Sequence, residues 1–403
     1  MKKIIYNGKI VLPDKILEGY DIVVEDEFIT ELTSGEESIR KKYQQEQAEF
    51  YDAAGGYVMA GFIDTHSDYI EGLVQPRPTS IMDFQVSLCE AEKHLLSHGI
   101  TMMYHSLSLV KEDEKVERKS IRKKKNVERL VNILKGYEEE AHLIKHRFHA
   151  RYEIDNLEIY DYLKELMERG FVQELSFMDH TPGQGQYRDI EQYAETFRAW
   201  RDLEDDREFE KFLEESKKKP LATREQLMKL AELAKELQIP LASHDDDTEG
   251  KILLNKEDFG IRISEFPITM EVAKKAKECG MMVVVGAPNI LLNGSHAGNL
   301  SAEDAVKEGC ADILCSDYYP AALLHAIFLL EERGACTLPE AVRMVNLNPA
   351  KALGIDKEYG QIAPGKRADL IIVHKENQLP VLTKCFIDGN VVLQFEYQKS
   401  KAV

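Results

Sequence analysis

Residues 61–68, GFIDTHSD, join a short apolar run to two side chains that commonly bind metal ions. The run predicts a buried strand that ends in His66 and Asp68. Because side chains two residues apart on a strand point to the same side, these two groups can serve one site. Imidazole and carboxylate groups suit zinc and similar divalent ions. The stretch therefore predicts a strand with a metal site at its carboxyl end.

Similar apolar runs recur over residues 56–354 and alternate with amphipathic segments. The runs include GITMMYHS (99–106), IPLASHDD (239–246) and MMVVVGAPN (281–289), and TREQLMKLAELAKELQ (223–238) is typical of the helical segments. About eight such alternations in about 300 residues favour a parallel (β/α)₈ barrel of the α/β class. The alternative is a doubly wound open sheet, but no GxGxxG motif follows the first strand.

The two ends of the chain are patterned differently from its middle. Residues 1–55 and 355–403 alternate apolar and polar residues between tight turns, which predicts one small β-sandwich domain built from both ends. Within the barrel, residues 181–220 form a connection that is too long for a simple loop. It begins glycine-rich and becomes strongly charged, so we expect either a lid over the site or a helical decoration of the surface.

Composition limits the partners that we expect. The net charge is −19, which disfavours nucleic acid and anionic membranes as partners. Six scattered cysteines, without a CxxC pair, and the lack of a signal peptide or long apolar span predict a cytoplasmic protein. A homodimer is the expectation from base rates alone. The basic run at 115–130 is the exception in charge, and we expect it to be a solvated helix face or loop.

Polar and charged side chains lie at the ends of most predicted barrel strands. The carboxyl ends of barrel strands meet at one mouth, where active sites lie. His105 fills no required role, and we expect it to be structural, as we do six histidines in helical or other positions away from the mouth (His94, His98, His142, His146, His149 and His374). The residues that we place at the mouth are His66, Asp68, Glu153, Asp179, His180, His244 with Asp245, Asp246 and Asp247 directly after it, Glu265 and Asp317.

Several longer motifs resemble the amidohydrolase superfamily. They are the GFIDTHSD strand, NLNPAKALGI (346–355) and GQIAPGKRADLIIV (360–373). The superfamily usually carries His-x-His on its first strand and often a carboxylated lysine that bridges two metals, whereas this chain has His66-Ser67-Asp68 and only Glu153 as a plausible bridge. That departure resembles one branch of the superfamily, which hydrolyses a sugar triphosphate in the carbon–phosphorus lyase pathway of phosphonate breakdown. Five further motifs carry the same resemblance: HSDYIEGLVQPRP (66–78), FMDHTPGQGQ (177–186), ASHDDDT (242–248), GAPNILLNGSHAGN (286–299) and CSDYYP (315–320).

The resemblance implies a metal-dependent diphosphatase with a small phosphorylated substrate. It implies one or two divalent ions, zinc first, with manganese or iron also accepted by such ligands. Asp317 would be the base on a metal-bound water. The implied metal ligands are His66, Asp68, Glu153, His180 and His244.

Further partners are needed to hold a polyphosphate. The loop NGSHAGN (293–299) leads into a predicted helix, whose N-terminus suits an anion, and this makes Ser295, His296 and Asn299 candidate substrate ligands. Arg77, between two prolines, could grip a phosphoryl or phosphonate group. Two other hypotheses remain open: hydrolysis of a C–N bond, as in a deacetylase, cyclic amidase or deaminase, and a scaffold without metals.

Overall fold

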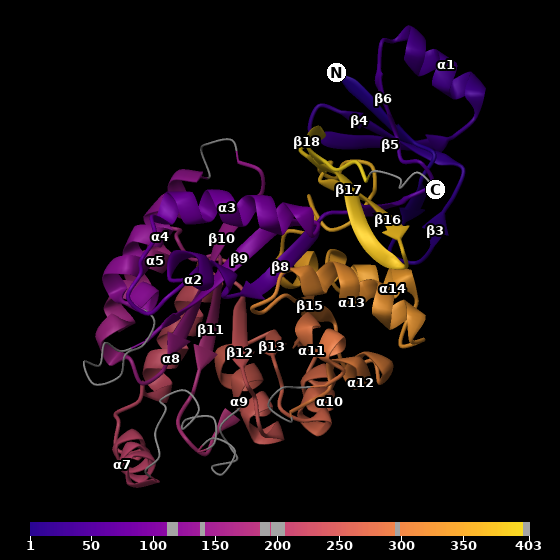
Figure 1. Cartoon of the computed structure of the whole chain (residues 1–403). Helices are drawn as coiled ribbons and strands as arrows, with labels where there is room; N and C mark the ends of the chain where they lie inside the picture. The colour runs from indigo at the N-terminus through magenta and orange to yellow at the C-terminus, as the bar shows by residue number, and fades with distance from the viewer. Residues whose placement is uncertain (111–119, 138–141, 186–193, 195–205, 295–298, 398–403) are drawn as a thin grey trace, which may run out of the picture.

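The computed structural model describes residues 1–110, 120–137, 142–185, 194, 206–294 and 299–397. Its centre is a sheet of eight parallel strands that follow one another in chain order (Figure 1). The strands are nearly all buried, as expected for a sheet covered on one side by helices and filled on the other by side chains. They are β8 (Phe62–Ser67), β9 (Ile100–Leu109), β10 (Lys145–Glu153), β11 (Glu174–Met178), β12 (Leu241–His244), β13 (Ile263–Glu265), β14 (Met282–Gly286) and β15 (Ile313–Cys315).

The first and last of these strands meet, which closes the sheet into a barrel. Ser67 and Asp317 form a parallel bridge just beyond β15. Two backbone hydrogen bonds support it: the Asp317 amide donates to the His66 carbonyl at 3.0 Å, and the Asp68 amide donates to the Asp317 carbonyl at 3.0 Å. The seam of the barrel therefore runs through three residues that the sequence places at the mouth.

Helices cover the outer face of the barrel (Figure 1). Helix α8 (Arg224–Glu236) shows why: Leu227, Leu230, Ala231 and Ala234 are buried at helical spacing, and Thr223 begins the helix with a capping box. The other described helices between the two ends of the chain are α2 (Tyr69–Val74), α3 (Phe84–Ser97), α4 (Lys124–Tyr137), α5 (Tyr160–Glu168), α7 (Asp206–Lys217), α9 (Glu249–Phe259), α10 (Met270–Glu278), α11 (Ala287–Leu292), α12 (Ala302–Lys307), α13 (Ala321–Glu332), α14 (Leu338–Arg343) and α15 (Leu347–Ala352), with short 3₁₀ turns at Ser120–Arg122 and Leu157–Ile159. Of these, α7 lies apart from the barrel strands (Figure 1).

Two further sheets come from the ends of the chain and pack on each other. A four-stranded sheet has the order β5-β4-β1-β6 and a six-stranded sheet the order β18-β17-β16-β7-β2-β3. Buried residues of both sheets, such as Ile22 and Phe386, share one core. The elements are β1 (Lys2–Tyr6), β2 (Lys9–Val11), β3 (Ile16–Leu17), β4 (Tyr20–Glu25), β5 (Phe28–Ser34), α1 (Glu37–Gln45), β6 (Glu49–Asp52), β7 (Tyr57–Ala60), β16 (Leu370–Glu376), β17 (Leu379–Ile387) and β18 (Asn390–Gln394).

One residue, Gly61, separates the sandwich from the barrel. Strand β7 ends at Ala60 and β8 begins at Phe62. A Cβ atom at Gly61 would lie 2.2 Å from Thr101 Oγ1, so the close approach of β9 excludes a side chain here. The expected domain boundary at residue 55 precedes β7, and the division into two folding domains stays a prediction.

The fold class predicted from the sequence, a (β/α)₈ barrel with a sandwich from both ends, is confirmed. Much of the expected insertion at 181–220 lies outside the described residues, so the lid stays a prediction. None of the described helices is long and apolar enough to cross a membrane.

Candidate active site

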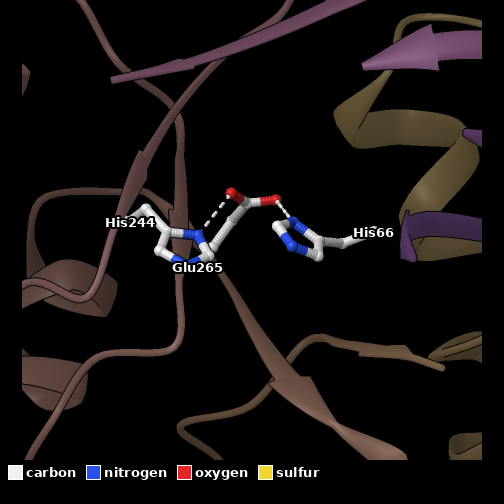
Figure 2. Close-up of side chains that lie close together, drawn as sticks. All are labelled: His66, His244 and Glu265. Atoms are coloured by element: carbon white, nitrogen blue, oxygen red, sulfur yellow. Dashed lines mark hydrogen bonds and ion pairs between the residues drawn. The ribbon is translucent and has the colours of Figure 1, made fainter. Parts of the chain in front are cut away.

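Two buried histidines face one buried carboxylate at the mouth of the barrel (Figure 2). His66 ends β8, His244 ends β12 and Glu265 ends β13. The distance from His66 Nδ1 to Glu265 Oε1 is 2.8 Å, and that from His244 Nδ1 to Glu265 Oε2 is 3.1 Å. The two rings stack with centroids 5.1 Å apart. One carboxylate therefore holds both imidazoles.

This arrangement selects the tautomer of both rings. Burial lowers the pKa of His66 and of His244 well below the usual value, and the charge of Arg151 lowers both further, so the rings are neutral. An ionised carboxylate only accepts hydrogen bonds, so each Nδ1 carries the proton. Each Nε2 is then unprotonated, which is the form of histidine that binds a metal ion, although a 3.4 Å contact from Arg151 Nη2 reaches that of His244.

A second cluster of histidine and carboxylate side chains lies on the Nε2 side of His244. His180 Nε2 lies 3.6 Å from Asp245 Oδ2, and His244 Nε2 lies 3.7 Å from the same oxygen. His180 Nδ1 is 2.7 Å from Glu153 Oε1. Burial alone would lower the pKa of His180, but the charges of Glu153 and Asp245 and the bond to Glu153 outweigh it and raise the pKa to about 9. His180 is thus a cation between two carboxylates when no ion is bound.

These groups fit a divalent metal ion. Asp245 Oδ2 is buried and has no hydrogen-bond partner among the described residues, although two ring nitrogens lie just beyond hydrogen-bond distance. A buried acceptor without a donor is costly, and a cation placed between these atoms would satisfy it. His66, His244 and Glu265, and His180, His244 and Asp245, are two sets whose ligand atoms all lie within 4.8 Å of one another.

Asp317 lies across the mouth, next to β8. Its backbone is in the left-handed region at φ 56°, which aspartate tolerates better than most residues. Burial and repulsion by the charge of Asp68 raise the pKa of its carboxyl to about 7, although the charge of Arg151 opposes the change. A carboxylate with that pKa accepts a proton readily near neutral pH.

Asp68 and the basic run meet at the edge of the site. Arg122 makes two hydrogen bonds to the buried carboxylate of Glu71, at 2.7 and 2.9 Å, and lies 3.6 Å from Asp68 Oδ2. The interpretation of 115–130 as solvated surface is wrong for this residue, because Arg122 is largely buried. Asp68 belongs to neither of the metal-type sets of the mouth.

A second layer of polar groups lies around the first. His149 and Arg151 are four and two residues before Glu153 on β10, so all three point into the barrel. His149 Nδ1 lies 3.6 Å from Glu174 and 4.0 Å from Glu265. The expectation that His149 is ordinary placed it outside the site, whereas it lies directly beside Glu265.

The predicted site residues divide into groups. His66, His180, His244 and Glu153 come together at the mouth, although the structure does not test which of them bind an ion. Arg77 is exposed, in a turn where its carbonyl accepts from the Ser80 amide at 3.0 Å. Asn299 is partly buried just before α12. Ser295 and His296 lie outside the described residues, so the anion loop stays a prediction.

Asp245 and Glu265 are expected at strand ends from the sequence but not among the ligands. His149 and Arg151 were missed, although the period of two on β10 already places them on the face of Glu153. His105 points to His146, with the two ring nitrogens 2.8 Å apart.

Known proteins resemble the chain over most of its length. It is 32% identical over 380 residues to the α-D-ribose 1-methylphosphonate 5-triphosphate diphosphatase of Escherichia coli K12, covering 93% of this chain and 96% of that one. An adenine deaminase of Clostridium botulinum (strain 657 / Type Ba4) is 34% identical over 96 residues, which is 22% of this chain and 16% of the deaminase.

Solved structures share the fold at low sequence identity. An N-acetylglucosamine-6-phosphate deacetylase from Pasteurella multocida superposes with a TM-score of 0.64 at 12% identity, over 97% of this chain and 99% of the deacetylase. A prolidase complexed with N-methylphosphonate-L-proline superposes with a TM-score of 0.63 at 14% identity, over 98% of this chain and 100% of the prolidase. The Amidohydrolase family model matches residues 215–393. With the barrel, the histidine–carboxylate mouth and the full-length relative, these matches show that the chain belongs to the amidohydrolase family of hydrolases.

Proposed function

We propose that this hydrolase cleaves α-D-ribose 1-methylphosphonate 5-triphosphate with one water to give the 5-phosphate and pyrophosphate. The observation that carries the proposal is the full-length similarity to a diphosphatase with that name, over 93% of this chain. The five motifs quoted from separate strands and loops, with the His66-Ser67-Asp68 departure, resemble the same branch of the superfamily. The reaction would serve phosphonate breakdown.

We further propose that His66, His180 and His244, with carboxylates of the mouth, hold one or two divalent ions, zinc first. A bound ion would neutralise charge on phosphoryl oxygens and lower the pKa of water. Glu265 fixes both ring tautomers through its contacts with Nδ1 of His66 and His244. Glu153 and Asp68 stay candidate ligands, since the first contacts His180 and the second lies near Arg122.

Asp317 is the proposed general base. Its carboxyl is buried at the seam, and its pKa near neutrality lets it take a proton from the attacking water and release it afterwards. The backbone pairing of Asp317 with His66 and Asp68 fixes its position relative to the strand that carries the first ligand. Precise placement of this kind is what an in-line attack on phosphorus requires.

The competing hypothesis is hydrolysis of a C–N bond. A short local similarity to adenine deaminase favours it, but that match covers only 22% of this chain. Phosphorus NMR of the metal-loaded protein with α-D-ribose 1-methylphosphonate 5-triphosphate distinguishes the two. We expect pyrophosphate to appear with many turnovers, and to be lost with Asp317→Asn. If metal is present and no pyrophosphate forms, the proposal is wrong, and N-acyl and cyclic amide substrates come next.

A further inference from the structure

Arg151 is a buried guanidinium at the mouth of the barrel. It lies on β10, two residues before Glu153, with 9% of its surface exposed. Its Nε donates to Met178 Sδ at 3.1 Å, and its Nη2 donates to His244 Nε2 at 3.4 Å. Both acceptors are uncharged, because burial keeps His244 neutral. Nη1 has no hydrogen-bond partner within the described part of the chain.

No carboxylate pairs with Arg151 among the described residues. Arg122, by contrast, is held by both oxygens of Glu71. Arginine stays protonated in proteins, and a buried charge without a close counter-ion is expensive. Asp317 attracts the guanidinium only from beyond ion-pair distance, so the described structure holds this cation without a carboxylate in direct contact.

Binding of a metal ion at His244 would leave Arg151 with still fewer hydrogen-bond acceptors. The bond from Arg151 Nη2 uses the lone pair of His244 Nε2, which is the pair that a metal ion would take. In a loaded enzyme Nη2 would need another acceptor, and no carboxylate of the described residues lies within ion-pair distance of Arg151. A group from outside the protein, carrying negative charge and at least two acceptor atoms, would satisfy Nη1 and Nη2 together.

We propose that Arg151 binds a phosphoryl group of the substrate through its two terminal nitrogens, as the specificity-determining residue of the site. The proposal rests on the hydrolysis of the triphosphate anhydride proposed above and adds the residue that recognises phosphate. Guanidinium and phosphoryl oxygens match in charge and in fork geometry, whereas a neutral amide substrate would leave Arg151 uncompensated. Arg151 would thus favour phosphorylated substrates on a barrel that also suits amide hydrolysis.

Binding of inorganic phosphate to the metal-loaded protein tests the proposal without turnover. Arg151→Met removes the charge and keeps a long unbranched side chain. Arg151→Lys keeps the charge but lacks the two parallel terminal nitrogens of the guanidinium group. Arg147→Met is the matched control: it lies on the same face of β10 about 13 Å away, toward the other end of the strand. Isothermal titration calorimetry gives the affinities, and metal analysis before and after each titration confirms equal ion content.

We expect Arg151→Met to weaken phosphate binding about 10- to 100-fold, the loss typical of hydrogen bonds to a charged group. Arg151→Lys should fall between Arg151→Met and the wild type, and Arg147→Met should bind like the wild type. Unchanged affinity in Arg151→Met, with full metal content and a cooperative unfolding transition, would overturn the proposal. Equal losses in Arg151→Met and Arg147→Met would also overturn it, because they would show a general structural effect.

The outcome is separable from that of the proposed function. If the triphosphate is hydrolysed but phosphate affinity does not depend on Arg151, the inference fails and the function stands. If phosphate binds through Arg151 but the triphosphate is not cleaved, the function fails and the enzyme acts on another phosphorylated substrate. If Arg151→Met loses metal rather than phosphate, Arg151 only positions His244 and the inference is wrong.

Discussion

Asp317→Asn should stabilise the metal-free protein while it disables the enzyme. The pKa of the Asp317 carboxyl is raised from its ordinary 3.8 to about 7 by burial and by the charge of Asp68. One pKa unit is worth 1.36 kcal/mol, so ionising this group in the folded state costs up to about 4 kcal/mol. Asparagine has the same shape, tolerates the positive φ and carries no charge.

The pH dependence has a definite sign. Because the folded-state pKa is raised, the wild type loses stability as pH rises from about 4 through about 7. The advantage of Asp317→Asn should therefore be full, up to about 4 kcal/mol, near pH 8.5 and smaller by about 2 kcal/mol near pH 5.5. Chelator-treated proteins are unfolded in urea at both pH values, and the midpoints and slopes give the free energies.

A control and a kinetic measurement complete the experiment. Asp258→Asn, in the exposed ion pair with Arg224, should give no stabilisation, because the pKa of Asp258 is lowered by that pair. In the metal-loaded enzyme, Asp317→Asn should lower kcat by roughly 10²- to 10⁴-fold if the group is the base. The reasoning is refuted if metal-free Asp317→Asn is no more stable than the wild type near pH 8.5, or if its kcat is near normal.

Three further predictions concern the ion, a buried pair and a helix. His180→Ala should lose bound metal by elemental analysis, and full occupancy would remove His180 from the ligands. Glu71→Gln should lower the free energy of unfolding by about 3 kcal/mol, because it removes the buried partner of Arg122; a change under about 1 kcal/mol would contradict that. Thr223→Ala should cost about 1 kcal/mol by removing the capping box of α8, and Thr223→Ser should recover most of it in the same urea titration.

The barrel was predictable because its signals are local. Strand runs such as Ile100–Leu109 are short and apolar, and helices such as Arg224–Glu236 carry a cap and a regular buried face. The histidines followed from the same pattern, since the fold brings all strand ends to one mouth. The pattern therefore places His66, His180 and His244 together without any knowledge of their contacts.

The electrostatics of the site were not predictable from local pattern. Arg122 sits in a basic run that resembles solvated surface, and its burial depends on Glu71, which lies 51 residues earlier. The role of Glu265 depends on two histidines that lie on other strands. Arg151 alternates correctly with Glu153, but only the three-dimensional arrangement shows that no carboxylate of the described residues lies within ion-pair distance of it. Pairings across the barrel carry no periodic signal in the chain.

The seam at Ser67 and Asp317 limits when the mouth of the barrel can be completed during synthesis. The two residues are 250 positions apart, so Asp317 pairs with β8 only after the last barrel strand has been made. Contacts at such long sequence separation also form slowly. Closing the barrel and bringing the proposed base to the mouth are thus one event.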